Sequence, residues 1–242
     1  MGISNRLSDQ INKHLNASRI DQQSKEKPRE YLGASILGKP CARQVQYMWK
    51  NIPEDEGKKI PAHVLRIFDI GRSYEELIIN WIREANFTLK TLGDNLKQIG
   101  FTFEEGKIRG HIDGIIQNGP KDCGPYPRLW ECKSMNAKRF YDFSHLGLQR
   151  SNITYYNQVQ IYMHQLKLHK NPAILTGINK DNGQMTHEAI PYDKKAALEM
   201  NTRAKEIIKK TENKELMPRI SSYRSHFECR YCSWQERCWK NE

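Results

Sequence analysis

The sequence has no long apolar run. Its 242 residues contain no stretch of the roughly 20 apolar residues that a membrane-crossing helix needs, and the mean hydropathy is −0.80. Residues 1–20 are polar and amphipathic, without the apolar segment of a secretory signal peptide. A membrane-bound or secreted protein is therefore not expected. The expected location is the cytoplasm of a bacterial, archaeal or phage-infected cell.

A nucleotide-driven motor is also missing. The chain contains no G-x-x-x-x-G-K-[ST] phosphate-binding loop, and no internal repeat or low-complexity tract. A helicase or recombination protein that worked with this chain would therefore be a separate partner.

Acidic residues are outnumbered. The chain has 39 Lys and Arg against 28 Asp and Glu, a formal charge of +11 and a pI near 9.3. Such an excess favours a polyanionic partner such as nucleic acid. Charge alone does not separate that reading from a soluble basic surface, because it does not say where the charges lie.

The hydrophobic pattern predicts an α/β fold with a central mixed β-sheet flanked by helices. Residues 1–30 are expected to form an N-terminal helix, over 1–20, and a polar linker, and residues 31–242 one domain. Helical spacing is expected over 35–49, interrupted or started at Gly38-Lys39-Pro40, and over 61–87, as one long helix or two abutting ones around Gly71. It is also expected over 137–149, 153–169 and 192–211. Strand patterns cover 97–104, 107–117, 128–134, 173–179 and 185–191.

Two acids and a lysine fall in adjacent predicted strands. Alternate residues of a strand share one face, so Glu131 and Lys133 project together while Cys132 points the other way into packing. If the strand that carries Asp113 pairs with this one, the two carboxylates and the ammonium meet. Such an oxygen-rich site suits Mg²⁺ or Mn²⁺, although a lone Glu-x-Lys pair is more often an ordinary strand surface.

The segments GHIDGIIQ and LWECKSMN together resemble the core of the RecB-like PD-(D/E)XK nucleases, with Asp113, Glu131 and Lys133 in the D, E and K positions. Ile112 stands where the signature has proline. The resemblance implies a restriction-endonuclease-like core and metal-dependent phosphodiester hydrolysis. It also implies that the backbone carbonyl of Cys132 is a metal ligand.

Two helical segments extend the resemblance. In GRSYEELI, Glu75 matches a metal-ligand position of the RecB-like nucleases, with Glu76 as the adjacent competitor and a solvated helix face as the alternative. In YYNQVQIYMHQL, Gln158 and Tyr162 match a Q-x-x-x-Y element that contacts DNA. Tyr162 could instead be a core residue.

The cysteines are few and unevenly spaced. Cys41 stands alone, whereas Cys229, Cys232 and Cys238 form C-x2-C-x5-C near the C-terminus. Four thiolates suit zinc or an iron-sulfur cluster. The spacing resembles that of iron-sulfur nucleases of the AddB and CRISPR-adaptation types, which implies a 4Fe-4S cluster, with Zn²⁺ as the alternative, that ties the N- and C-terminal segments together.

Other residues near these cysteines complete the expectations. The same resemblance makes Arg43 a candidate for a DNA phosphate contact, while Cys123 and the side chain of Cys132 are expected not to be ligands. The expected function is a metal-dependent exonuclease that acts on DNA, with single-stranded ends as the expected substrate. The alternatives are a non-catalytic DNA-binding partner with the same fold and a zinc-binding regulatory module.

Overall fold

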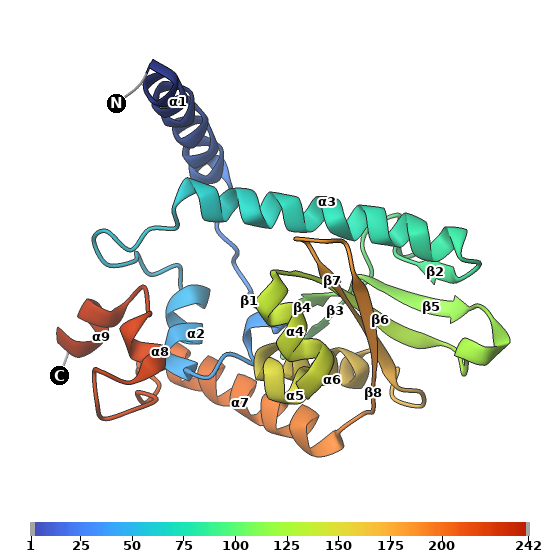
Figure 1. Cartoon of the computed structure of the whole chain (residues 1–242). Helices are drawn as coiled ribbons and strands as arrows, with labels where there is room; N and C mark the ends of the chain where they lie inside the picture. Colours follow the sequence, from blue (N-terminus) through green and yellow to red (C-terminus); the bar gives the residue numbers. More distant parts are fainter. Residues whose placement is uncertain (1–2, 241–242) are drawn as a thin grey trace.

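The computed structural model describes residues 3–240, and it begins with a long helix that stands out from the body, α1 (Ile3–Lys25) (Figure 1). The helix runs beyond the predicted end at residue 20, so the linker prediction is wrong for residues 21–25. The segment is polar but contains no helix breaker before Pro28, and Lys25 pairs with Asp21 one turn earlier at 2.6 Å. Residues 1, 2, 241 and 242 lie outside the described part of the chain.

The strands form two sheets, which confirms an α/β fold with mixed pairing. The larger sheet has the order β2-β5-β6-β7-β8, and the smaller has the order β1-β4-β3. In the larger sheet β6 and β7 are parallel and the other pairs are antiparallel. Their bounds are β1 Leu32–Gly33, β2 Thr88–Lys90, β3 Gly100–Phe103, β4 Ile108–His111, β5 Gly114–Asn118, β6 Arg128–Met135, β7 Ala173–Asn179 and β8 Met185–Ile190.

The predicted strand over 107–117 is in fact two strands that belong to different sheets. β4 ends at His111 and pairs with β3, whereas β5 begins at Gly114 and pairs with β6. The break falls at Ile112 and Asp113. Ile112 is buried and its backbone N–H donates to the Ile99 carbonyl at 3.0 Å, so the chain crosses between the sheets at the residue that carries the predicted acid.

Helices cover both faces of the larger sheet. On one face lies α3 (Ala62–Glu84), whose Ile78 packs with Trp130, Cys132 and Ile178. On the other face lie α4 (Ala137–Leu146), α5 (Leu148–Ser151), α6 (Ile153–Gln165) and α7 (Lys194–Glu212), as Figure 1 shows. Trp130 and Cys132 therefore face α3, while Leu129 and Met135 face the other helices, which is the alternation that a strand predicts.

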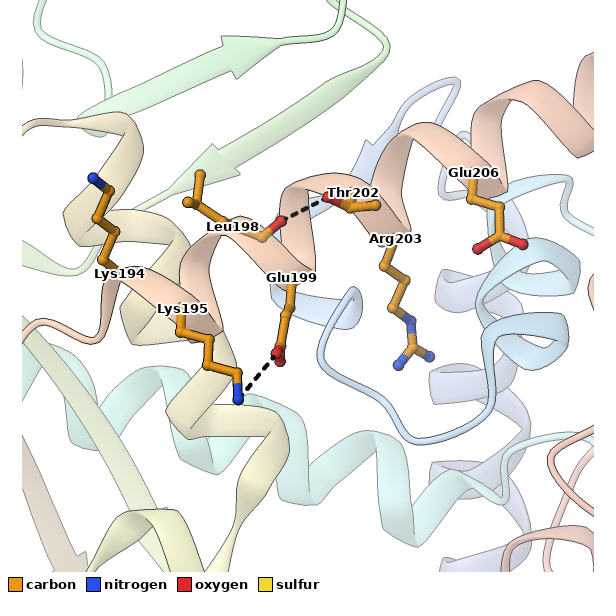
Figure 2. Close-up of a pocket in the computed structure, with 7 residues that line it drawn as sticks. All are labelled: Lys194, Lys195, Leu198, Glu199, Thr202, Arg203 and Glu206. Atoms are coloured by element: carbon orange, nitrogen blue, oxygen red, sulfur yellow. Dashed lines mark hydrogen bonds and ion pairs between the residues drawn. The ribbon is translucent and has the colours of Figure 1, made fainter.

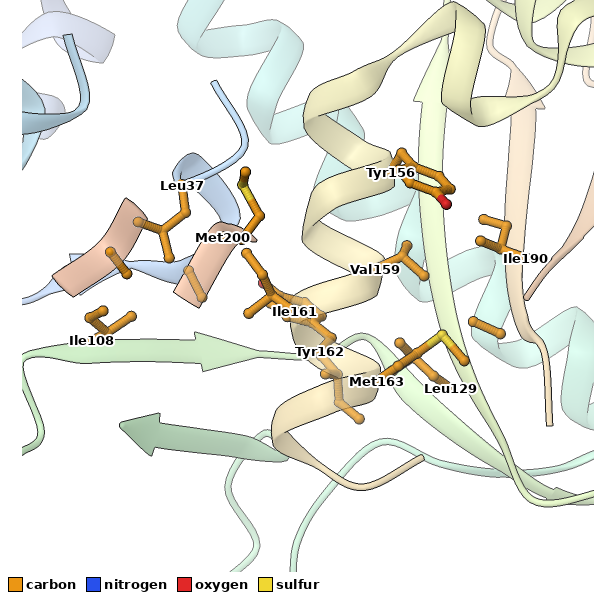
Figure 3. Packing of buried hydrophobic residues seen from close by; sticks show 14 of the residues in the cluster. Leu37, Ile108, Leu129, Tyr156, Val159, Ile161, Tyr162, Met163, Ile190 and Met200 are labelled. Atoms are coloured by element: carbon orange, nitrogen blue, oxygen red, sulfur yellow. The ribbon is translucent and has the colours of Figure 1, made fainter. Parts of the chain in front are cut away.

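The main core surrounds α6. Val159, Ile161 and Met163 of this helix are buried against side chains of the strands and of α7, among them Leu129 and Met200 (Figure 3). No helix within residues 3–240 is long and apolar enough to cross a bilayer.

The N- and C-terminal segments meet at one end of the molecule. The predicted helix over 35–49 is divided at Pro40 into a 3-10 turn (Ala34–Ile36) and α2 (Ala42–Trp49). The C-terminal segment contributes α8 (Phe227–Arg230) and α9 (Gln235–Lys240) beside α2 (Figure 1). Several hydrogen bonds join the C-terminal segment to the loop after α2. Among them, Trp234 Nε1 donates to the Ile52 carbonyl at 2.8 Å, and the Asp55 carboxylate accepts from the Glu236 N–H at 2.6 Å.

Candidate active site

The site forms where the chain passes from β4 to β5. Gly114 is paired with Trp130, so Asp113, one residue earlier, lies beside Glu131. The two acids are locked by reciprocal hydrogen bonds: Asp113 Oδ2 accepts from the Cys132 N–H at 2.8 Å, and the Asp113 N–H donates to Glu131 Oε1 at 3.3 Å. Backbone pairing therefore fixes both carboxylates.

The lysine joins the two acids. Lys133 Nζ lies 3.1 Å from Glu131 Oε2 and 3.5 Å from Asp113 Oδ2. The structure thus brings Asp113, Glu131 and Lys133 together in one place, which we call the carboxylate cluster.

Burial and mutual charge shift the pKa values of the groups in this cluster. Glu131 is only 1% exposed. Burial and then the charge of Asp113 raise the pKa of Glu131 to about 8, although Lys133 acts in the opposite direction. Burial would lower the pKa of Lys133, but the two neighbouring carboxylates outweigh it and hold that pKa well above its ordinary value. One ammonium therefore does not fully compensate the acids.

A third acid comes from α3. Burial and the charge of Asp113 raise the pKa of Glu75 to about 7, partly offset by Lys133, so this half-buried carboxylate lies within electrostatic reach of the cluster. Glu76 is exposed. Of the two adjacent candidates, Glu75 is the one that the helix directs to the site.

Helix α6 places two more side chains beside the acids. Gln158 is buried, and its side-chain amide donates to Glu131 Oε2 at 3.0 Å. Tyr162 is also buried, packs edge-on against Phe101 at 5.3 Å, and has its pKa raised by burial and by the charge of Glu131. Both residues thus lie beside the acids, and Gln158 touches a carboxylate directly.

Sequence reasoning missed Tyr155. It is partly exposed, and the centroid of its ring lies 5.5 Å from Lys133 Nζ. The spacing was informative, because residues 155, 158 and 162 recur at helical intervals on one face.

The donor set fits a hard divalent cation. Asp113, Glu131 and Glu75 offer carboxylate oxygens. Burial, and then the charge of Asp113, raise the pKa values of Glu131 and Glu75 by disfavouring their ionised forms, and a bound cation would favour those forms. Within residues 3–240, however, no group of three or more His, Cys, Asp or Glu side chains is already arranged to hold a metal ion. A bound cation would have to draw these carboxylates inward or complete its shell with water and backbone oxygen.

The cysteines gather at the other end of the molecule. Cys41, Cys229, Cys232 and Cys238 line a single pocket between α2 and the C-terminal segment, which we call the cysteine pocket. Burial raises the pKa values of Cys229 and Cys232, and the other pocket thiols raise them further. Cys123 is exposed and lies outside this pocket.

Polar hydrogens around the cysteine pocket suit sulfur ligands. The Trp234 N–H donates to Cys232 Sγ at 3.5 Å, and Arg43 Nη1 donates to Cys238 Sγ at 3.6 Å. Tyr47 Oη and Trp239 Nε1 also belong to residues that line the pocket, and both are buried without a hydrogen-bond partner in the described chain. Unpartnered buried donors are rare, so these two donors and the four thiols are the side chains that a sulfur-ligated group would meet here. As they stand within residues 3–240, the four thiols are not arranged to hold a metal ion.

Arg43 lies at the cysteine pocket. Its Nε donates to the Met217 carbonyl at 2.5 Å while its Nη1 reaches Cys238. The guanidinium is thus hydrogen-bonded to Met217 and Cys238, and its contact with a DNA phosphate stays a prediction.

Two further hollows differ in their relation to the cluster. A polar pocket beside Gln158 and Tyr162 is lined also by Arg29, Arg109 and His111. A larger open depression of about 720 Å³ lies along α7 and is lined by Lys195, Glu199, Arg203 and their neighbours (Figure 2). It shares no residue with the carboxylate cluster, so its size does not make it the active site.

The site thus combines an acid at the junction of β4 and β5 with an acid and a lysine two residues apart on β6. This arrangement is typical of a nuclease centre. The family model described as "PD-(D/E)XK nuclease superfamily" matches residues 24–239, and the chain belongs to this superfamily. No curated protein matches the chain significantly.

Solved structures share the fold at low identity. LHK-Exo, an alkaline exonuclease from Laribacter hongkongensis, gives a TM-score of 0.53 at 13% identity, over 84% of this chain and 93% of its own. The structure of SSO0001 gives a TM-score of 0.49 at 17% identity, over 93% and 95%. The likeness to LHK-Exo supports the fold.

Proposed function

We propose that this protein is a divalent-metal-dependent deoxyribonuclease that acts as an exonuclease on DNA ends, with single strands preferred. The observation that carries the proposal is the meeting of Asp113, Glu131 and Lys133 at the junction of β4 and β5. Superfamily membership supports the reaction class.

The chain's own residues divide the work. Asp113, Glu131, Glu75 and the Cys132 carbonyl would hold Mg²⁺ or Mn²⁺, which supplies an acidified water and stabilises charge on the phosphate. Lys133 orients the attacking water and offsets phosphate charge. Gln158 fixes the Glu131 carboxylate through its 3.0 Å hydrogen bond, and Tyr162 packs behind it.

A non-catalytic DNA-binding partner is the alternative function. All the residues of the carboxylate cluster are present and in contact, whereas a chain kept only as a scaffold has no need for a half-buried lysine between two acids. The intact cluster therefore favours the enzyme.

We further propose that the cysteine pocket holds a 4Fe-4S cluster, with Zn²⁺ as the alternative. The four thiols lie in one pocket with unpartnered donors around them. Its role would be structural, because it would join α2 to the C-terminal segment within one nuclease domain of residues 31–242. A separate helicase or recombination protein would supply unwound strands.

The test uses end-labelled single- and double-stranded DNA incubated with the full chain. Cleavage with Mg²⁺ or Mn²⁺ that stops in EDTA is expected, with faster loss of single strands. Tight DNA binding without cleavage under any divalent ion would instead favour the non-catalytic alternative.

A further inference from the structure

A groove leads away from the carboxylate cluster. Tyr155, whose ring faces Lys133, lines a small pocket with Ser134 and Arg139 and also a larger pocket of about 480 Å³ with Arg139 and Arg150. The two pockets share Arg139, Ser151, Asn152 and Tyr155. They therefore form one continuous groove, and Tyr155, whose ring lies 5.5 Å from Lys133 Nζ, links this groove to the cluster.

The wall of this groove carries unpaired positive charge. Lys39, Arg139 and Arg150 line the outer pocket together with Glu228, and Asp142 is the acid that lines the inner pocket beside Arg139. Among residues 3–240 none of the three cations takes part in an ion pair. Uncompensated cations along a groove are the footprint of a phosphate backbone.

The segment that carries Lys39 is fixed in place. Arg203 of α7 donates to the carbonyls of Lys39 and Pro40. Gly38 lies so close to α6 that an added Cβ would stand 2.7 Å from the Thr154 carbonyl oxygen. The backbone of residues 38–40 is thus held between α6 and α7, which places Lys39 at the groove.

Aromatic rings stand at the outer end of the groove. Phe227 lines the outer pocket and is 71% exposed, and Tyr231, 70% exposed, meets it edge-on at 5.3 Å. Both flank the buried Cys229, so the cysteine pocket anchors the turn that presents them. Exposed rings beside a basic groove are the arrangement on which unpaired bases stack.

We propose that this groove, from Tyr155 past Arg139, Arg150 and Lys39 to Phe227 and Tyr231, binds an unpaired DNA strand. The cations contact successive phosphates and the rings stack on bases. Duplex DNA cannot use the rings, because its bases already stack on one another. The proposal rests on the proposed function for its direction toward the cluster, but the binding it describes does not require cleavage.

The test is fluorescence anisotropy with labelled oligo(dT) and a duplex of equal length, using the full chain in EDTA. Phe227→Ala combined with Tyr231→Ala should weaken oligo(dT) binding about tenfold or more, while duplex affinity stays the same. Arg139→Glu combined with Arg150→Glu should weaken both and flatten the salt dependence of single-strand binding. Lys195→Glu, on the exposed face of α7, is the control for a charge reversal outside the groove.

Each result bears on the groove in a defined way. Wild-type affinity for oligo(dT) in the aromatic variant, or an equal loss in Lys195→Glu, overturns it. Phe227→Leu serves if the alanine variant melts early, because leucine keeps apolar volume but stacks poorly on bases, and it too should bind oligo(dT) more weakly. Binding that responds as expected without cleavage by the wild type contradicts only the nuclease proposal, whereas cleavage with unaffected binding contradicts only the groove.

Discussion

Gln158 Nε2 lies 3.0 Å from Glu131 Oε2, and Gln158 belongs to the buried middle of α6, residues 156–163. This hydrogen bond ties the packing of α6 to a carboxylate of the site. The neighbouring Gln160 faces elsewhere, donating to the Pro191 carbonyl and accepting from the Asp193 N–H. Gln158 therefore contacts the site, whereas Gln160 joins α6 to the segment before α7.

Replacing Gln158 by alanine should reduce activity more than stability. Without this hydrogen bond the Glu131 carboxylate is no longer held in one position, so kcat should fall about 10- to 100-fold. Half-maximal activity should also need a higher Mg²⁺ concentration. Gln160→Ala should instead lower Tm by about 3 to 8 °C with near-normal specific activity. Kinetics and thermal melting compare the two, and equal activity losses would argue against a positioning role for Gln158.

Metal binding should depend on pH. In the metal-free protein the pKa values of Glu75 and Glu131 are raised to about 7 and about 8. Folded carboxylates with raised pKa values hold protons that the unfolded chain has released, so their contribution to stability falls as pH rises through this range. A bound cation offsets this loss of stability because it favours the ionised forms of Glu75 and Glu131.

The Mg²⁺-induced rise in Tm should therefore be larger at pH 8.5 than at pH 6, and calorimetry should show proton release on binding. Glu131→Gln is the control and should lose most of the difference. An Mg²⁺ effect of the same size at both pH values would show that these carboxylates do not bind the ion.

The cysteine pocket makes a colorimetric prediction. The protein purified without oxygen should be brown, with iron and acid-labile sulfide that Cys41→Ser and Cys229→Ser lack. Both variants should also melt at least about 5 °C lower, because the metal joins distant segments. Cys123→Ser, at an exposed cysteine outside the pocket, should match the wild type. Colourless protein with stoichiometric zinc would replace the iron-sulfur proposal with the zinc alternative.

Much of the fold followed from periodicity. Strand alternation placed Glu131 and Lys133 on one face and Cys132 on the other, and the long helix over 61–87 was found as α3. The break at Ile112 was not predictable, because a continuous alternating pattern does not record which partner strand each half chooses. The two-residue β1 and three-residue β2 were missed since such short edge segments carry too few residues for a pattern.

The site was predictable where neighbouring residues define it and less so where long-range contacts do. Strand pairing brings Asp113, Glu131 and Lys133 together, as the alternation and the family resemblance predicted. The phosphate contact of Arg43 stays a prediction, and its hydrogen bond to the Met217 carbonyl, 174 positions away in sequence, could not be foreseen from a local pattern. The nearness of Tyr155 to Lys133 likewise depends on how α6 packs across the end of β6.

The most direct test of the central claim is the cleavage rate of end-labelled single-stranded DNA by Lys133→Ala at saturating Mn²⁺. We expect the cleavage rate to fall at least about 1,000-fold, with the fold retained by circular dichroism. Lys138→Ala, on the exposed start of α4, should cleave at the normal rate. Cleavage by Lys133→Ala at the wild-type rate would contradict the central claim.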